Sequence, residues 1–152
     1  MTIETVLTSG VVAALVSGLV SLRNSERKLV IENITQERTK WREKIREKNL
    51  QIHEAHQSKE SGKVEAAGAE LRLLLNPMDP IDRDILSEIA ILKNSESTQK
   101  DMERFSIKLS LLLKHDWERA KQETKDAFYK KHEAVKRVTY EEYQNETANK
   151  AN

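Results

Sequence analysis

The sequence contains no cysteine, which excludes disulfide bonds, thiolate catalysis and zinc sites built from thiolates. Glycine and proline together supply six of the 152 residues and aromatic residues 5%, fewer than β-sandwiches and barrels usually contain. Positive and negative side chains nearly balance, 26 Lys and Arg against 25 Asp and Glu, so attraction to an anion requires a local cluster. These shortages favour an all-α fold, and the length excludes a multi-domain enzyme.

One stretch of the chain lacks charge altogether. Residues 5–22 (TVLTSGVVAALVSGLVSL) form an 18-residue uncharged run, and later segments are interrupted by charges within a few residues. As a helix this run reaches roughly 27 Å, close to the ~30 Å hydrocarbon core of a bilayer. A cleavable signal peptide and a buried core helix are the alternatives, although no positive charge precedes the run as a signal peptide requires. The sequence therefore predicts an N-terminal transmembrane anchor, residues 1–23, with the lipid bilayer as a partner.

The charges and small residues around this run predict its orientation and its assembly. Arg23, Arg27 and Lys28 follow the run and no Lys or Arg precedes it, which places the N-terminus outside and the C-terminal domain in the cytoplasm. Gly10, Ala14 and Gly18 recur every fourth residue, a spacing that lets helix backbones approach closely in lipid. We therefore expect a homo-oligomer that associates through these three positions.

The remaining sequence predicts a helical domain, residues 24–138. Residues 24–57 contain neither Gly nor Pro and repeat apolar residues every 11 positions, which is typical of one long stalk helix. Further helices are predicted over residues 63–75, from Pro80 after the N-cap Asp79, and from about Met102 to about Val138. Residues 139–152 lose this periodicity and are predicted to be a flexible tail. The predicted fold is all-α: one N-terminal transmembrane helix followed by a cytoplasmic bundle of about four helices.

Two basic segments are candidate ligand-binding sites. Arg38, Arg42 and Arg46 lie at i+4 spacing within residues 23–50, which carry nine positive and five negative charges. Their pattern fits either a solvated helix that attracts anionic headgroups or an anion site, because guanidinium groups bind phosphate in a bidentate manner. Lys121 and Lys125 follow Trp117 and would bind a nucleotide by charge and stacking, or else form an exposed helix face.

No pattern in the sequence indicates catalysis or a cofactor. A phosphate-binding glycine loop, a zincin motif and a nucleophile elbow are all missing. His53 and His56 have no third metal ligand nearby, and the acidic residues from Asp79 to Glu88 fit the first turns of a helix, where the helix dipole favours carboxylates. We therefore expect no enzyme, no metal and no cofactor.

Several short motifs carry a resemblance. They are Ile34-Thr35-Gln36-Glu37-Arg38, Trp41-Arg42, Ile45-Arg46, Leu71, Leu75-Asn76-Pro77 and Asp79 to Asp82. Through them, over about residues 5–92, the chain resembles small bacterial proteins of unassigned function that join one N-terminal span to a helical cytoplasmic domain. Its general layout is similar to the membrane effectors of CRISPR and other anti-phage systems, whose cytosolic domain binds a cyclic oligonucleotide. The resemblance implies a bacterial inner-membrane protein and no particular ligand residues.

Three functions remain open at this point. The first is an oligomeric membrane effector in anti-phage defence that senses an anionic signal such as a cyclic oligonucleotide and perturbs the bilayer. The second is a passive membrane-anchored scaffold that recruits a protein partner. The third, a phage lysis protein of spanin type, requires a periplasmic domain, opposite to the orientation that the charges predict. None of the three involves duplex nucleic acid.

Overall fold

The computed structural model describes residues 3–125 and 134–151, and it describes side chains from residue 11 onward, except at 27, 30, 124, 125 and 151. Over these ranges the chain forms five helices and no β-strand, which confirms the predicted all-α class. The chain divides into two units, Met1–Trp41 and Arg42–Asn152. Each unit is described separately below.

The first unit is helical, and the part of it that precedes Arg23 is strongly apolar. Helix α1 (Ile3–Gln57) provides all of its regular structure and continues into the second unit, which confirms the predicted end of the long helix at Gln57. Seven large aliphatic side chains of this unit are each between 53% and 66% exposed: Val11, Val12, Leu15, Val16, Leu19, Val20 and Leu22. Within the described residues, no helix offers an apolar stretch long enough to cross a membrane. The predicted span over residues 5–22 starts among residues whose side chains lie outside that description, so it stays a prediction.

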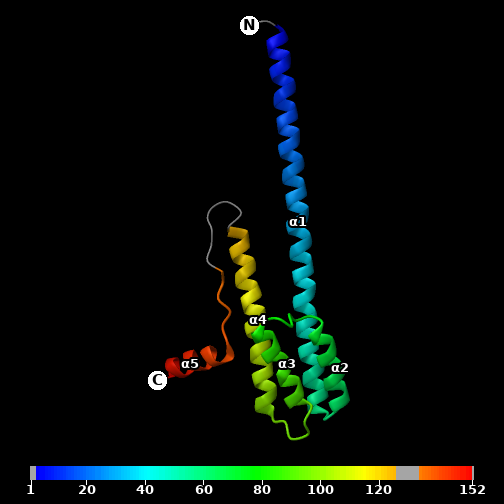
Figure 1. The fold of residues 1–152 in the computed structure, drawn as a ribbon, viewed down its shortest axis with the longest axis vertical. Coiled ribbons are helices and arrows are strands. Elements are labelled where there is room, and N and C mark those ends of the chain that lie inside the picture. The colour runs from blue at the N-terminus through cyan, green and yellow to red at the C-terminus, as the bar shows by residue number, and fades with distance from the viewer. Residues whose placement is uncertain (1–2, 126–133, 152) are drawn as a thin grey trace. The chain divides into compact units, whose positions relative to one another are not determined.

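The second unit is a helical bundle, as predicted. Figure 1 shows α2 (Ser61–Arg72), α3 (Pro80–Leu92) and α4 (Gln99–Lys125) beside the last part of α1, with successive helices running in opposite directions. Residues from all four helices build the core, and the largest fully buried side chains are Phe105, Ile45, Ile52, Leu71, Ile85, Met102, Leu109 and Val64. The bundle therefore buries aliphatic residues around one phenylalanine.

Local sequence signals explain where the short helices begin. Asp79 caps α3, since its carboxylate accepts hydrogen bonds from the backbone N–H groups of Ile81 and Asp82 at 2.8 and 3.2 Å, and Pro80 follows at the first helical position. This start was predicted. At α4, the Asp101 carboxylate accepts a hydrogen bond from the N–H of Thr98 at 2.8 Å. Both helix starts are thus fixed by side chains close in sequence.

The C-terminal region differs from the prediction. Residues 134–139 are not helical, so the expected continuation of the fourth helix to Val138 is wrong. Residues 140–151 form α5 (Tyr140–Ala151), whereas the sequence predicted a flexible tail over residues 139–152. The cause is a capping box. The N–H of Thr139 donates to the Glu142 carboxylate at 3.0 Å, and the N–H of Glu142 donates to the Thr139 hydroxyl at 3.2 Å.

Candidate functional site: a tryptophan between two cations

Two of the predicted ligand-binding residues meet at Trp117 in the second unit. The Arg42 guanidinium, from α1, lies 5.5 Å from the centre of the Trp117 ring, and the Lys121 ammonium, from α4, lies 5.3 Å from it. Both distances fall within the range of a cation–π contact. Trp117 is still 51% exposed. The structure therefore brings together a basic residue from each of the two segments that the sequence singled out.

Arg42 already forms an ion pair with an acidic side chain of α4. Its Nε atom lies 2.6 Å from the Asp116 carboxylate, and the two side chains are only 14% and 13% exposed. The Nη2 atom of the same guanidinium is buried without a hydrogen-bond partner. Because a shielded ion pair is costly to break, Arg42 primarily joins α1 to α4. It is less available to a ligand than the sequence suggested.

Lys121 is more open to solvent. Its ammonium lies 3.1 Å from the Glu118 carboxylate one turn away, in a pair whose side chains are 47% and 45% exposed. Exposed ion pairs of this kind contribute little to the free energy of unfolding, and ions from the solvent readily screen them. The accessible part of the cluster is therefore Lys121 together with the outer part of Trp117.

The other predicted residues do not join this cluster. Arg38 belongs to the first unit, where it is half-buried and already has an interaction partner. Arg46 is exposed in the second unit. The side chain of Lys125 and position Gly10 lie outside the part of the chain whose side chains are described. Ala14 and Gly18 are exposed in the first unit, and an added Cβ at Gly18 would meet no atom within 4 Å.

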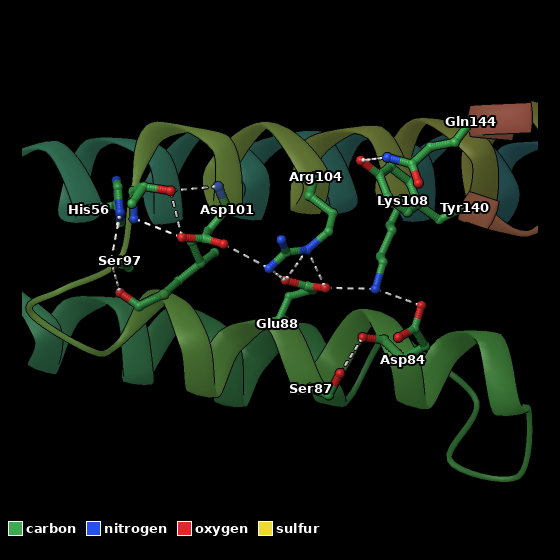
Figure 2. A network of polar contacts seen from close by, with 12 residues as sticks. His56, Asp84, Ser87, Glu88, Ser97, Asp101, Arg104, Lys108, Tyr140 and Gln144 are labelled. Atoms are coloured by element: carbon green, nitrogen blue, oxygen red, sulfur yellow. Dashed lines mark hydrogen bonds and ion pairs between the residues drawn. The ribbon is translucent and has the colours of Figure 1, made fainter. Parts of the chain in front are cut away.

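A buried charge network between α3 and α4 was not predicted. Glu88, whose side chain is 4% exposed, binds Arg104 at 2.8 Å and Lys108 at 2.6 Å. Figure 2 shows how Asp84 and Asp101 extend this network along the two helices, at 2.7 Å from Lys108 and 2.9 Å from Arg104. The sequence does show acidic residues on α3 and basic residues on α4. Their pairing can be predicted only when it is known that the two helices are neighbours.

The network changes the proton affinities of its members. Burial raises the pKa of Glu88, but the hydrogen bonds and charges of Arg104 and Lys108 outweigh burial and lower the pKa below its ordinary value of 4.5. Burial likewise lowers the pKa of Lys108, and its contacts with Asp84 and Glu88 reverse the sign and raise it. Glu88 and Lys108 therefore stay charged near neutral pH and hold α3 and α4 together.

A second unpredicted cluster joins residues 134–139 to the start of α3. Arg137 lies 2.5 Å from the Asp82 carboxylate and 3.1 Å from that of Asp79. Burial raises the pKa of Asp79, but the N–H groups of Ile81 and Asp82 and the charge of Arg137 together lower it. The acidic residues that the sequence explained by helix capping alone thus also bind a distant arginine.

A hollow in the second unit holds none of the predicted ligand-binding residues. It encloses about 530 Å³ between the α1–α2 and α3–α4 connections and is lined by polar groups that include His56 and Ser97. The His56 Nε2 atom lies 2.9 Å from the Ser97 hydroxyl, which also donates to the carbonyl of Leu92 at 3.3 Å. In the part of the chain that the structure describes, no third side chain orients the histidine, so this pair lacks the arrangement of an activated nucleophile there. Among the described residues, no group of three His, Asp or Glu side chains could hold a metal ion.

Comparison with known proteins yields no relative. No protein-family model, no curated protein and no solved structure matches this chain significantly.

Proposed function

We propose that this chain is a membrane-anchored, self-associating helical effector whose second unit is a cytoplasmic sensor of an anionic signal. The observation that carries the proposal is the uncharged run before Arg23, in which the large aliphatic side chains from Val11 to Leu22 are each between 53% and 66% exposed. Monomeric soluble proteins rarely expose a contiguous apolar surface of this kind. Insertion into lipid would remove this apolar surface from water.

The two sides of the apolar helix suit two kinds of contact. At 3.6 residues per turn, the large side chains from Val11 to Leu22 cover about half of the circumference. Ala13, Ala14, Ser17, Gly18 and Ser21 occupy the other half. In lipid, the large half would face acyl chains, and the small half would let two helices approach closely. This supports a homo-oligomer built through Gly10, Ala14 and Gly18.

The cluster around Trp117 is the favoured place for the signal. A half-exposed indole offers a surface for a nucleobase, and Lys121 offers charge for a phosphate. A cyclic oligonucleotide combines both groups. Among possible anions, this is the class that we propose.

The Arg42–Asp116 ion pair supports a route from the ligand to the anchor. It connects α4, which carries Trp117 and Lys121, to α1, the helix that the two units share. A ligand that binds one arrangement of α4 more tightly than another would shift the balance between them, by ~1 to 3 kcal/mol in typical cases. The proposed output is perturbation of the bilayer in anti-phage defence.

The test uses the full chain and cyclic oligoadenylates. Purified protein should bind one of them, and Lys121→Gln and Trp117→Ala should weaken binding at least ten-fold, about 1.4 kcal/mol, because they remove charge and stacking. Lys114→Gln is the matched control, since Lys114 is an exposed lysine on the same helix. Expression with a source of the signal should collapse the membrane potential. Absence of binding together with an intact potential would contradict the proposal.

A passive membrane-anchored scaffold is the second candidate. It is favoured by the ion pairs of Arg42 with Asp116 and of Lys121 with Glu118, which give both cations acidic partners within the domain. Affinity purification separates the two functions. A stoichiometric protein partner without ligand-dependent dye leakage from vesicles would support the scaffold, and leakage would support the effector.

A further inference from the structure

The connection between α2 and α3, residues 73–79, presents two large apolar side chains to solvent. Leu73 is 85% exposed and Met78 is 83% exposed, more than any other large hydrophobic side chain among the described residues. They lie five residues apart on one short connection. We call this segment the α2–α3 loop.

The exposure is fixed by the fold of the loop. The N–H of Asn76 donates to the Asp82 carboxylate at 2.8 Å, and the N–H of Met78 donates to the Asn76 side chain at 3.0 Å. Leu75, between the two exposed residues, is only 7% exposed and is part of the core. Hydrogen bonds and the buried Leu75 side chain therefore fix the conformation of the loop. Burying Leu73 and Met78 within the domain would require breaking these contacts.

The charge around the loop is positive. Arg72 ends α2 and Arg83 lies in the first turn of α3; both are exposed and neither has an ion-pair partner among the described residues. Arg137 pairs with the nearby carboxylates of Asp79 and Asp82 and offsets one of their two negative charges, so the three arginines and two aspartates near the loop leave a net charge of +1. Two exposed arginines thus lie on either side of the loop in the sequence, and the local charge is weakly positive.

We propose that the α2–α3 loop docks on the surface of an anionic lipid bilayer. Two such side chains offer roughly 200 Å² of apolar surface. That is well below the ~800 Å² that each partner contributes to a stable protein interface. A bilayer needs no matching shape: Leu73 and Met78 enter the acyl boundary while Arg72 and Arg83 bind anionic headgroups. This surface belongs to the second unit alone, so it does not depend on insertion of the first unit.

The absence of cysteine makes a direct test possible. In the full chain, Met78→Cys is labelled with an environment-sensitive fluorophore, and Ser95→Cys, an exposed position in the α3–α4 connection, serves as the matched control. Protein is mixed with vesicles of phosphatidylcholine alone or of phosphatidylcholine with phosphatidylglycerol. The label at 78 should shift to the blue and brighten several-fold with the anionic vesicles, while the label at 95 should stay unchanged. Equal behaviour of the two labels in both lipids would overturn the proposal.

Charge variants test the role of the arginines. Arg72→Gln and Arg83→Gln should each reduce the ratio of docked to undocked loop about five-fold, which corresponds to ~1 kcal/mol for each charge near the surface. Lys100→Gln removes an exposed lysine near the start of α4 and should have no effect. If the arginine variants show the same ratio of docked to undocked loop as Lys100→Gln, headgroup binding by Arg72 and Arg83 is contradicted.

Two further measurements separate this proposal from the function proposed above. A fluorophore attached at Val16→Cys reports on the first unit. If residues 5–22 insert, its emission should shift to the blue in both lipids, because its surroundings become apolar. If the label at 16 stays in water while the label at 78 responds to anionic lipid, the anchor is refuted and the loop proposal stands. A blue shift at 78 without lipid that grows with protein concentration would show self-association instead and would refute lipid docking.

Discussion

At the scale of single residues, the close packing of α2 on α3 depends on the glycine of α2 that faces α3. Gly68 is buried, and a Cβ added to it would lie 2.5 Å from the Cγ2 atom of Ile89. Because Ile89 is β-branched and sits in the core, it has few alternative rotamers. Only glycine therefore fits at position 68 without displacing Ile89.

We predict that Gly68→Ala destabilises the protein by about 1 to 3 kcal/mol, because overpacking outweighs the better helix propensity of alanine. Gly62→Ala is the matched control in the same helix, where an added Cβ meets nothing within 4 Å. That variant should be neutral or slightly stabilising. Urea denaturation of both variants measures the difference, and equal midpoints would contradict the close packing of α2 on α3.

The buried carboxylate of Glu88 gives the stability a pH dependence. Because its pKa is lowered in the folded protein, its contribution is complete well above 4.5, the ordinary value, and is lost as the pH falls through the lowered value. We predict that Glu88→Gln costs about 1 to 3 kcal/mol at neutral pH, as expected for losing hydrogen bonds between charged groups. The variant should also lose less stability than the natural chain between neutral and acidic pH.

Glu65→Gln is the control for this measurement, because Glu65 pairs with Lys93 through side chains that are 65% and 41% exposed. Exposed pairs contribute little, so this variant should retain both the stability and its pH dependence. Thermal unfolding at a series of pH values tests both expectations. An unchanged acid dependence in Glu88→Gln would mean that other carboxylates control it.

At the scale of elements, residues 134–151, which include α5, are held to the bundle by polar contacts. None of the described residues from 134 onward is buried. The contacts include the hydrogen bond at 3.1 Å between the His115 ring and the carbonyl of Val135, and Lys108 positioned 5.8 Å from the centre of the Tyr140 ring. Segments with few buried apolar contacts open locally before the whole domain unfolds.

We predict that Thr139→Ala uncaps α5 at a local cost of about 0.5 to 2 kcal/mol. Amide hydrogen exchange should accelerate within residues 140–151 and stay unchanged in α2 and α3. Thr147→Ala, an exposed threonine within α5, is the control and should keep the protection of the first turn. Faster exchange throughout the bundle would contradict the view of α5 as a separate local unit.

The same elements indicate what the sequence can reveal. The start of α3 was predictable, because Asp79 and Pro80 act on neighbouring residues. The helix α5 follows an equally local signal, the Thr139–Glu142 capping box, which was overlooked because the segment has little apolar periodicity. The 11-residue repeat predicted the continuous α1, but Ile45 and Ile52 are buried whereas Ile34 is 49% exposed. Periodicity therefore indicates a shared face without showing where along the helix that face is covered.

Long-range partners were beyond the sequence. Arg42 was predicted as a ligand-binding residue, but its partner Asp116 comes from a segment 74 residues later in the chain. The same applies to Arg137 with Asp82, which are 55 residues apart. Which acid meets which base depends on helix packing, and one sequence with balanced charges permits many pairings.

At the scale of the whole molecule, the proposed function requires residues 5–22 to enter lipid. A single positive charge placed within this uncharged run should prevent insertion, since an arginine at the centre of a membrane helix costs ~2.5 to 3.5 kcal/mol even on insertion scales. Leu15→Arg is suitable because Leu15 lies in the middle of residues 5–22 and is 63% exposed, so the substitution disturbs no internal packing.

The most direct measurement is fractionation of lysed cells that express the full chain, with high-speed centrifugation followed by an alkaline carbonate wash of the pellet. The account predicts that the natural chain remains in the washed membranes until detergent is added, and that the Leu15→Arg variant is released. Recovery of the natural chain in the supernatant without detergent would contradict it.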